Sequence, residues 1–289
     1  MRWIQKTNAG PRLFVDWLEV NTEEIEAKIA DRDTTGDDLW DFFRDNADEY
    51  DALKTKLIEE QGYICCYCGK RIQNDNSTSI EHVKPKSIYK QETLKFSNLL
   101  VSCNGSHKNQ IHVIQLSETL LFVAEKYGVD QEYLEDVYVN VDNVKLFGKE
   151  YDLENLQIGD RIVVIPFIKG EQHCDNKKGK KEIDISPLQK DCESKFSYDR
   201  LSGKIVKTIE NKLTLEVLGL NSNRLLNQLR KKKLDSADFL VEQLMEDFGD
   251  NPIELIDNRA LLLNNLERPN PITHYLEPFV FVLRWGILN

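Results

Sequence analysis

The chain has 289 residues, of which 40% are hydrophobic and 30% are charged, and its formal net charge at pH 7 is −11. This composition is typical of a globular protein of one large or two modest domains, and it contains no apolar run of about 18 residues such as a membrane span requires. The first residues lack the apolar stretch of a signal peptide, so we expect a cytoplasmic location, where six cysteines serve as metal ligands or buried small residues.

The acidic charge is concentrated near the N-terminus. Between Asp16 and Asp51 there are 14 acidic and three basic residues, so this segment accounts for the whole net charge. A solvated helical face is the simpler interpretation, and an edge that faces a basic partner protein is the alternative.

The spacing of apolar residues divides the chain into three parts. It predicts two or three helices in residues 12–60, followed from Gly62 by a region of cysteines, glycines and short β-prone runs. Within that region, residues 115–127 predict a helix and residues 161–168 predict a strand. After a hairpin-like stretch at 201–210, the periodicity predicts one long amphipathic helix or two.

We therefore expect an α+β, mainly helical protein. The expected parts are an N-terminal helical segment (1–60), a central unit (61–210) with an inserted lobe at about 106–170, and a C-terminal helical segment (211–289).

The central unit begins with the motif ICCYCGKRI, residues 64–72. Cys65 and Cys68 have the two-residue spacing of a zinc knuckle, and Gly69 allows the tight turn that points both thiolates at one ion. The same spacing occurs in thioredoxin-like redox pairs. A redox pair needs a helix directly after the motif, however, and GKRIQNDNSTS is a poor helix.

Two further sulfurs would complete a tetrahedral zinc site. The candidates are Cys103 and Cys174, whereas Cys66 and Cys192 are assigned to the core.

Three polar motifs follow the first two cysteines. Glu81 and His82 are neighbours in SIEHVKPKSIY, Asn98 precedes an apolar run in FSNLLVSCNG, and Asp175 and Lys178 lie in HCDNKKGK. A single histidine beside an acid is usually a surface group or a satisfied core group. The order of all these motifs along one chain is much more specific.

This order resembles the HNH, or ββα-metal, endonucleases. More narrowly, it is similar to the PtuB family of HNH subunits from Septu-type and retron-associated anti-phage systems, over roughly residues 60–210. The resemblance implies a zinc-stabilised core of two antiparallel strands and a helix around one catalytic divalent ion. The implied function is metal-dependent hydrolysis of phosphodiester bonds in nucleic acid, with DNA favoured over RNA.

The resemblance also implies roles for individual residues. His82 would be the general base that takes a proton from the attacking water, and Asn98 would orient its loop. Glu81 and Asp175 would bind Mg²⁺ or Mn²⁺. The family usually has aspartate in the place of Glu81, and it often has asparagine or histidine in the place of Asp175. Lys178 would contact phosphate.

The zinc would be structural and separate from the catalytic ion, held by Cys65, Cys68, Cys103 and Cys174. Seventy residues lie between Cys103 and Cys174, where the usual family form has two. Loop-closure cost grows only logarithmically with length, so the site tolerates the insertion. The nearby histidines leave the fourth ligand open: His107, His112 or His173 could replace a cysteine.

Lysines flank the expected catalytic motifs and predict a basic collar for nucleic acid. The expected contacts are Lys84, Lys86, Lys177 and Lys180; Lys90 and Lys181 lie in the same runs, and RKKK at 230–233 could add phosphate contacts. A solvated loop is the alternative for each run. No base-reading element is visible, so the sequence predicts no sequence specificity.

The chain contains no phosphate-binding loop of the G-x-x-x-x-G-K-[ST] type. This fits the division of labour that the resemblance implies, in which the chain is the nuclease subunit of an anti-phage defence complex and a PtuA-like ATPase acts with it. A retron reverse transcriptase and its msDNA are a further candidate partner. We expect no association with a membrane. The acidic N-terminal helices or the C-terminal helices would be the docking surface. The competing interpretations are a non-catalytic zinc-binding module that recruits nucleic acid or protein, and a thiol oxidoreductase that uses Cys65 and Cys68.

Overall fold

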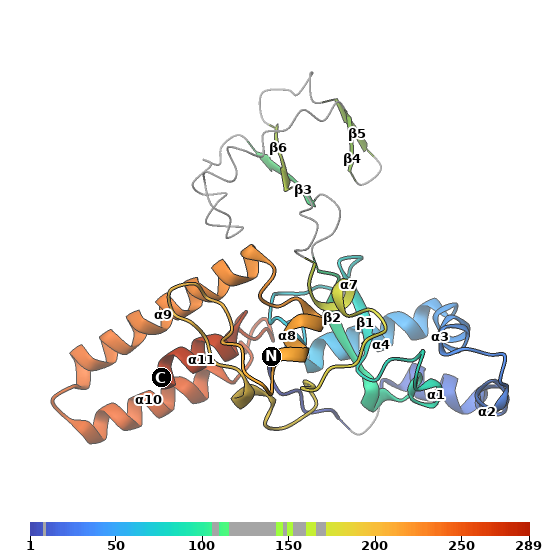
Figure 1. The fold of residues 1–289 in the computed structure, drawn as a ribbon, viewed down its shortest axis with the longest axis horizontal. Helices are drawn as coiled ribbons and strands as arrows, with labels where there is room; N and C mark the ends of the chain where they lie inside the picture. Colours follow the sequence, from blue (N-terminus) through green and yellow to red (C-terminus); the bar gives the residue numbers. More distant parts are fainter. Residues whose placement is uncertain (8–9, 106–109, 116–142, 147–148, 153–159, 166–171) are drawn as a thin grey trace.

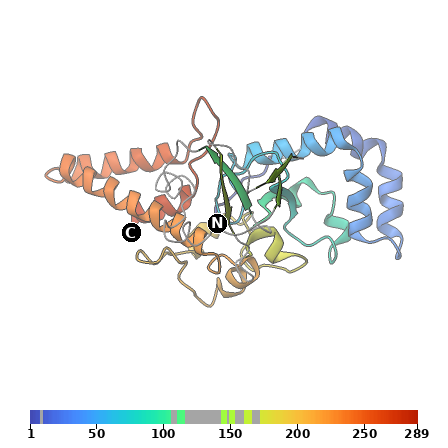
Figure 2. The same cartoon turned by 90° about the horizontal axis from the view of Figure 1, so that it is seen from above.

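The computed structural model describes residues 1–7, 10–105, 110–115, 143–146, 149–152, 160–165 and 172–289, with backbone only for the four strands between 110 and 165. The protein is α+β: helices predominate in the described residues, and the sheets are small two-stranded pairs. None of the described helices combines the length and apolarity needed to cross a bilayer. In Figure 1 the N-terminal helices lie on one side of a small β1–β2 sheet and the C-terminal helices on the other, an arrangement that Figure 2 shows from above.

The N-terminal part contains four helices rather than the two or three expected. These are α1 (Arg12–Val20), α2 (Thr22–Ala30), α3 (Gly36–Arg44) and α4 (Ala47–Glu60). Two of the breaks lie at asparagines: the side-chain amide of Asn21 donates to Trp17 O (2.8 Å), and that of Asn46 donates to Phe42 O (3.0 Å). Such side chains compete with the backbone for helix hydrogen bonds, and this divides a continuous periodic pattern into separate helices.

Aromatic side chains hold these helices together. Phe43 of α3 packs edge-on against Phe14 and Trp17 of α1, with ring centroids 5.1 and 5.0 Å apart. At the end of α4, the Gln61 side chain accepts from the Val101 N–H (2.6 Å) and donates to the Val101 carbonyl (2.8 Å). The helical part is thereby fastened to the central sheet.

The central sheet consists of β1 (Thr78–His82) and β2 (Leu99–Cys103), paired antiparallel. His82 lies opposite Leu99, and Thr78 lies opposite Cys103. The short helix α7 (Cys174–Lys178) packs against β2, as Figure 1 shows. Short 3-10 turns η1 (Lys90–Glu92) and η2 (Phe96–Asn98) lie between the two strands, and η4 (Cys192–Lys195) follows α7.

The segment between β2 and α7 contains four strands in two antiparallel pairs. β3 (Gln110–Gln115) pairs with β6 (Asp160–Ile165), and β4 (Asn143–Leu146) pairs with β5 (Lys149–Asp152). The strand predicted at 161–168 is confirmed as β6. The helix predicted at 115–127 lies outside the described residues, apart from its first position in β3.

The C-terminal part contains α8 (Lys212–Leu218), α9 (Arg224–Phe248), α10 (Pro252–Leu266) and α11 (Val280–Leu288). The long periodic stretch, from Leu225 to Met245, is therefore the single helix α9. The expectation of phosphate contacts at RKKK is wrong for its first residue, because the Arg230 guanidinium is buried and donates to Gly203 O (2.8 Å) and Leu220 O (2.7 Å). Lys231 and Lys233 pair with Asp235 and Glu277.

Candidate active site and metal centre

Four cysteines converge at the centre of the molecule. Cys65, Cys68, Cys103 and Cys174 are buried, and their sulfurs all lie within 4.8 Å of one another. The Sγ atoms of Cys65 and Cys174 are 3.8 Å apart, and those of Cys68 and Cys103 are 3.7 Å apart. Ligands about 2.3 Å from a tetrahedral zinc ion lie about 3.8 Å from one another, so the group could hold a structural metal such as zinc.

The local turn at residues 64–71 explains how the first two sulfurs reach one point. Cys65 N–H donates to Lys70 O (2.8 Å), and Gly69 N–H donates back to Cys65 O (3.0 Å), with Gly69 at a φ of +78°. No helix follows Cys68, which removes the structural context that a thioredoxin-like pair needs. Cys66 and Cys192 are buried in the core outside the four-cysteine group, as expected.

The second two sulfurs meet because the insertion begins and ends at nearly the same place. A Cβ added to Gly105, just after β2, would lie 2.2 Å from the carbonyl oxygen of His173, just before α7. Cys103 and Cys174 are therefore brought together despite their sequence separation. Cys174 has a φ of +54°, a conformation that is unfavourable for a residue with a side chain.

His173 lies beside the cysteine group. Its Nδ1 is 3.1 Å from Cys174 Sγ and 3.8 Å from Cys103 Sγ, so the imidazole can hydrogen-bond to the sulfurs. The convergent group itself contains four cysteines and not His173. His107 and the His112 side chain lie outside the described residues.

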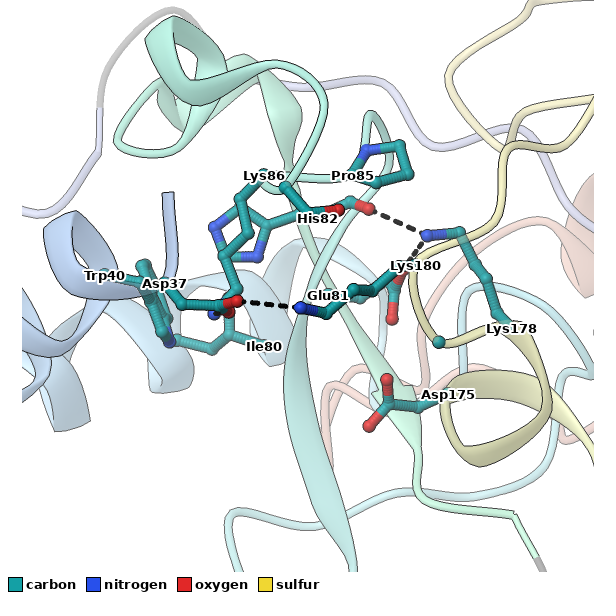
Figure 3. Close-up of a pocket in the computed structure, with 12 residues that line it drawn as sticks. Asp37, Trp40, Ile80, Glu81, His82, Pro85, Lys86, Asp175, Lys178 and Lys180 are labelled. Atoms are coloured by element: carbon teal, nitrogen blue, oxygen red, sulfur yellow. Dashed lines mark hydrogen bonds and ion pairs between the residues drawn. The ribbon is translucent and has the colours of Figure 1, made fainter. Parts of the chain in front are cut away.

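A second polar group gathers where β1 ends and α7 begins. Glu81 is buried, and its Oε1 lies 2.6 Å from Lys178 Nζ and accepts a hydrogen bond from Tyr67 Oη (3.2 Å). Asp175, one turn before Lys178, faces the same carboxylate (Figure 3). Burial raises the pKa of Glu81 to about 7, with Asp175 adding to the effect and Lys178 opposing it. Two carboxylates and one ammonium leave one negative charge for a cation to balance.

Lys178 differs from its expected role. We expected its ammonium to contact phosphate, but the side chain is 1% exposed, pairs with Glu81 and donates to the His82 carbonyl (3.0 Å). A buried charge needs a partner, and Glu81 supplies it. In this structure Lys178 fixes the end of β1 rather than reaching outward.

His82 lies on the opposite side of the strand from Glu81, toward α3. Its Nε2 is 3.0 Å from Thr93 O, and its ring packs edge-on against Trp40, with centroids 4.6 Å apart. A carbonyl can only accept, so Nε2 carries the proton and Nδ1 keeps its lone pair. Burial, assisted by Lys86, lowers the pKa of His82 to about 3, which leaves the ring neutral.

Asn98 ties together the loop after β1. Its amide oxygen accepts from Lys84 N–H (2.8 Å), and its amide nitrogen donates to Lys84 O and Glu92 O (3.1 Å each). The side chain therefore holds the backbone that follows His82 and does not enter the pocket.

The acidic and imidazole groups line one pocket of about 230 Å³. Its walls come from three segments that are distant in sequence, as Figure 3 shows: α3, the end of β1 with its following loop, and α7 with its following turn. Sequence reasoning missed Asp37, Trp40 and Thr93. Asp37 and Trp40 are one helical turn apart in the acidic segment, but nothing in their local pattern indicates that this face of α3 meets the pocket.

The expected basic collar is only partly present at the pocket. Lys86 and Lys180 line it, and both pair with Asp37. Lys84 is exposed and Lys177 is partly buried, and neither lines the pocket. Lys90 does not belong to the collar, because its ammonium binds the backbone carbonyls of Lys28, Asp31 and Thr34 at the end of α2.

No protein-family model matches the chain, and no curated protein is significantly similar to it.

Proposed function

We propose that the chain is a metal-dependent HNH endonuclease of the PtuB type, which hydrolyses phosphodiester bonds in nucleic acid. The observation that carries the proposal is the convergence of Glu81, His82 and Asp175 on one pocket. Glu81 and His82 end strand β1, which pairs antiparallel with β2, and Asp175 lies in the short helix α7, next to four cysteines that could hold a structural metal.

The two metal sites have separate tasks in this proposal. Cys103 lies opposite Thr78, three residues before Glu81 in β1. At the rise of a strand, Glu81 is therefore about 10 Å along β1 from the position opposite Cys103. The soft, closed cysteine group suits zinc, whereas Glu81 and Asp175 suit Mg²⁺ or Mn²⁺. When bound, that divalent ion would polarise the scissile phosphate and stabilise the leaving oxygen.

The chain's own residues position the water and receive its proton. The Thr93 carbonyl and the Trp40 ring hold His82 in one orientation, with the lone pair of Nδ1 available. As the water oxygen bonds to phosphorus, its proton passes to Nδ1, the bond from phosphorus to the leaving sugar oxygen breaks, and that oxygen takes a proton from solvent. Lys178 binds the backbone at the end of β1 and Asn98 binds the backbone just after it, so both keep Glu81 and His82 in position.

A non-catalytic zinc-binding module explains less of the site. It accounts for the four cysteines, but it leaves the buried Glu81–Lys178 pair and the buried His82 without a use. Buried charges of this kind are costly and concentrate at functional sites.

A partner ATPase fits the limited basic surface around the pocket. We propose delivery to DNA by a PtuA-like ATPase within an anti-phage defence complex, with a retron reverse transcriptase and msDNA as a further candidate partner. Helix α10 buries none of its residues and exposes Ile253, Ile256 and Leu261. Exposed apolar side chains of this kind are typical of a docking surface, so the C-terminal helices are favoured over the acidic N-terminal ones.

One assay tests the proposed function and identifies the substrate. Plasmid, single-stranded DNA and tRNA are incubated with the chain, with Mg²⁺, with Mn²⁺ or without added divalent ion, and with and without the ATPase. We expect divalent-ion-dependent cleavage of DNA that increases when the ATPase is present. Full binding without any cleavage, in every combination, would favour the recruitment module instead.

The raised pKa of Glu81 predicts how this activity depends on pH. The carboxyl group is protonated below about pH 7, and only the carboxylate binds a divalent ion. We expect the Mg²⁺ concentration for half-maximal cleavage to rise by about tenfold per pH unit below that value. His82 does not contribute to this limb, because its pKa is already low.

Mg²⁺ titrations of the cleavage rate at about pH 6 and about pH 8 check this prediction. Excess Mg²⁺ should restore most of the rate at the lower pH. A rate that stays low at saturating Mg²⁺ would show that another group titrates. Glu81→Gln serves as the reference variant, and we expect it to lose the metal dependence along with the activity.

A further inference from the structure

The Asp37 carboxylate stands between two lysines at the pocket. One of its oxygens is 2.8 Å from Lys86 Nζ, and the other is 3.0 Å from Lys180 Nζ. Lys86 follows β1 and Lys180 follows α7, so the carboxylate links the two sides of the pocket (Figure 3). Asp37 itself comes from α3, more than forty residues before Lys86.

The local structure of α3 places Asp37 there. Thr35 and Asp38 form a reciprocal capping box at the start of the helix, and Asp37 takes no part in that cap. The preceding Gly36 lies so close to the loop after β1 that an added Cβ would be 2.1 Å from Lys86 O. One turn later, Trp40 packs on His82. The start of α3 is therefore packed against the pocket, and this packing places the Asp37 carboxylate between the two lysines.

The two ion pairs are accessible to solvent, unlike the Glu81–Lys178 pair. The Asp37 side chain is 43% exposed, that of Lys180 is 74% exposed and that of Lys86 is 23% exposed, whereas Lys178 and Glu81 are 1% and 4% exposed. Solvent-exposed ion pairs contribute little to stability and exchange readily. An anion with the same acceptor geometry can therefore replace Asp37 without unfolding the site.

A phosphodiester has that geometry. Its two non-bridging oxygens share one negative charge, as carboxylate oxygens do, and ammonium groups bind both. An anion between Lys86 and Lys180 would lie in the pocket that Glu81 and His82 also line. Two of the lysines expected to bind nucleic acid, Lys86 and Lys180, thus already pair with one carboxylate of the acidic N-terminal segment.

We propose that Asp37 occupies the place of a substrate backbone phosphate and that the phosphodiester displaces it from Lys86 and Lys180. This inference rests on the proposed nuclease function and adds a residue that determines how strongly the pocket selects polyanions. Weakly held anions do not displace Asp37, whereas a nucleic acid backbone, anchored at several phosphates, does.

The test measures binding apart from cleavage. The full chain carries His82→Ala, no Mg²⁺ or Mn²⁺ is added, and a fluorescein-labelled DNA duplex is titrated by anisotropy over a range of salt concentrations. Asp37→Asn keeps the side-chain shape and removes the charge. We expect it to lower the Kd for DNA by about tenfold. The slope of log Kd against log salt concentration should become steeper by about one to two.

Asp41→Asn is the matched control. It removes the same charge from the same helix, one turn further on, where Asp41 pairs with Arg44 and does not line the pocket. A gain as large as that of Asp37→Asn would mean that only net charge matters and would overturn the inference. Weaker binding by Asp37→Asn would also overturn it, because Asp37 would then hold the lysines ready for substrate. Thermal unfolding of both variants excludes a folding defect, with Asp37→Ser as the second variant.

A double-mutant cycle assigns the effect to the lysines. In a Lys86→Gln background, Asp37→Asn should gain clearly less than it does alone, and an undiminished gain would contradict the inference. Calorimetry with inorganic pyrophosphate gives a readout that needs no nuclease. If the Asp37→Asn chain gains pyrophosphate affinity while no variant binds or cleaves DNA, the proposed function fails and the anion site stands. If the wild type cleaves DNA but Asp37→Asn gains nothing over Asp41→Asn, the role of Asp37 fails and the nuclease stands.

Discussion

Replacing His82 with alanine is expected to lower the rate of Mg²⁺-dependent cleavage by about 10²- to 10⁴-fold, the range that a positioned general base contributes. The Thr93 carbonyl fixes the imidazole so that Nδ1 holds the free lone pair, and none of the other described residues lining the pocket is a histidine. Single-turnover cleavage of the substrate identified by the plasmid, single-stranded DNA and tRNA assay measures this rate.

His274→Asn is the matched control for His82→Ala. His274 is exposed and does not line the pocket, and its φ of +58° is one that asparagine tolerates. We expect its cleavage rate to equal that of the wild type. Because His82 packs against Trp40, thermal unfolding must show that the alanine variant is still folded. A folded His82→Ala chain with full activity would exclude His82 as the base.

Loss of one cysteine ligand should be the most destabilising change in the chain. We expect about one tightly bound zinc per wild-type chain, and we expect Cys65→Ser to lose it and to unfold the central part at ordinary temperature. Structural zinc sites contribute roughly 10 kcal/mol or more to folding in small metal-dependent domains. Four buried thiols without an ion would also be left close together with no strong partner.

The adjacent cysteine provides the control for this change. Cys66 is buried as deeply as Cys65 but lies outside the four-cysteine group, so Cys66→Ala should keep the zinc and cost only about 1 kcal/mol. Elemental analysis and thermal unfolding of both variants compare them directly. Wild-type protein without zinc, or equal zinc loss in the two variants, would contradict the assignment of the metal centre.

The first half of the four-cysteine group could be predicted from the sequence. The turn at residues 64–71 is closed by hydrogen bonds between near neighbours, so the spacing of Cys65, Cys68 and Gly69 was enough to predict it. Cys103 and Cys174 were predicted only as candidates. Their meeting depends on the close approach of Gly105 and His173, which no local pattern encodes.

Roles of charged residues were harder to predict than the positions of the motifs. Lys90, Lys178 and Arg230 all occur in basic runs, yet each binds groups inside the protein. A lysine or arginine in a sequence has the same charge whether it faces solvent, a carboxylate or backbone carbonyls. Only the packing of distant segments decides which of these it meets.

The sequence by itself determined the α+β class, the cysteine turn and the adjacency of Glu81 and His82, because these follow from patterns among residues that are near one another in the chain. The tertiary structure decided that Lys178 neutralises Glu81, that Thr93 and Trp40 orient His82, and that Asp37 stands between Lys86 and Lys180. These contacts join segments that are far apart in the chain. They depend on how α3 and α7 pack around the end of β1, which only the folded structure specifies.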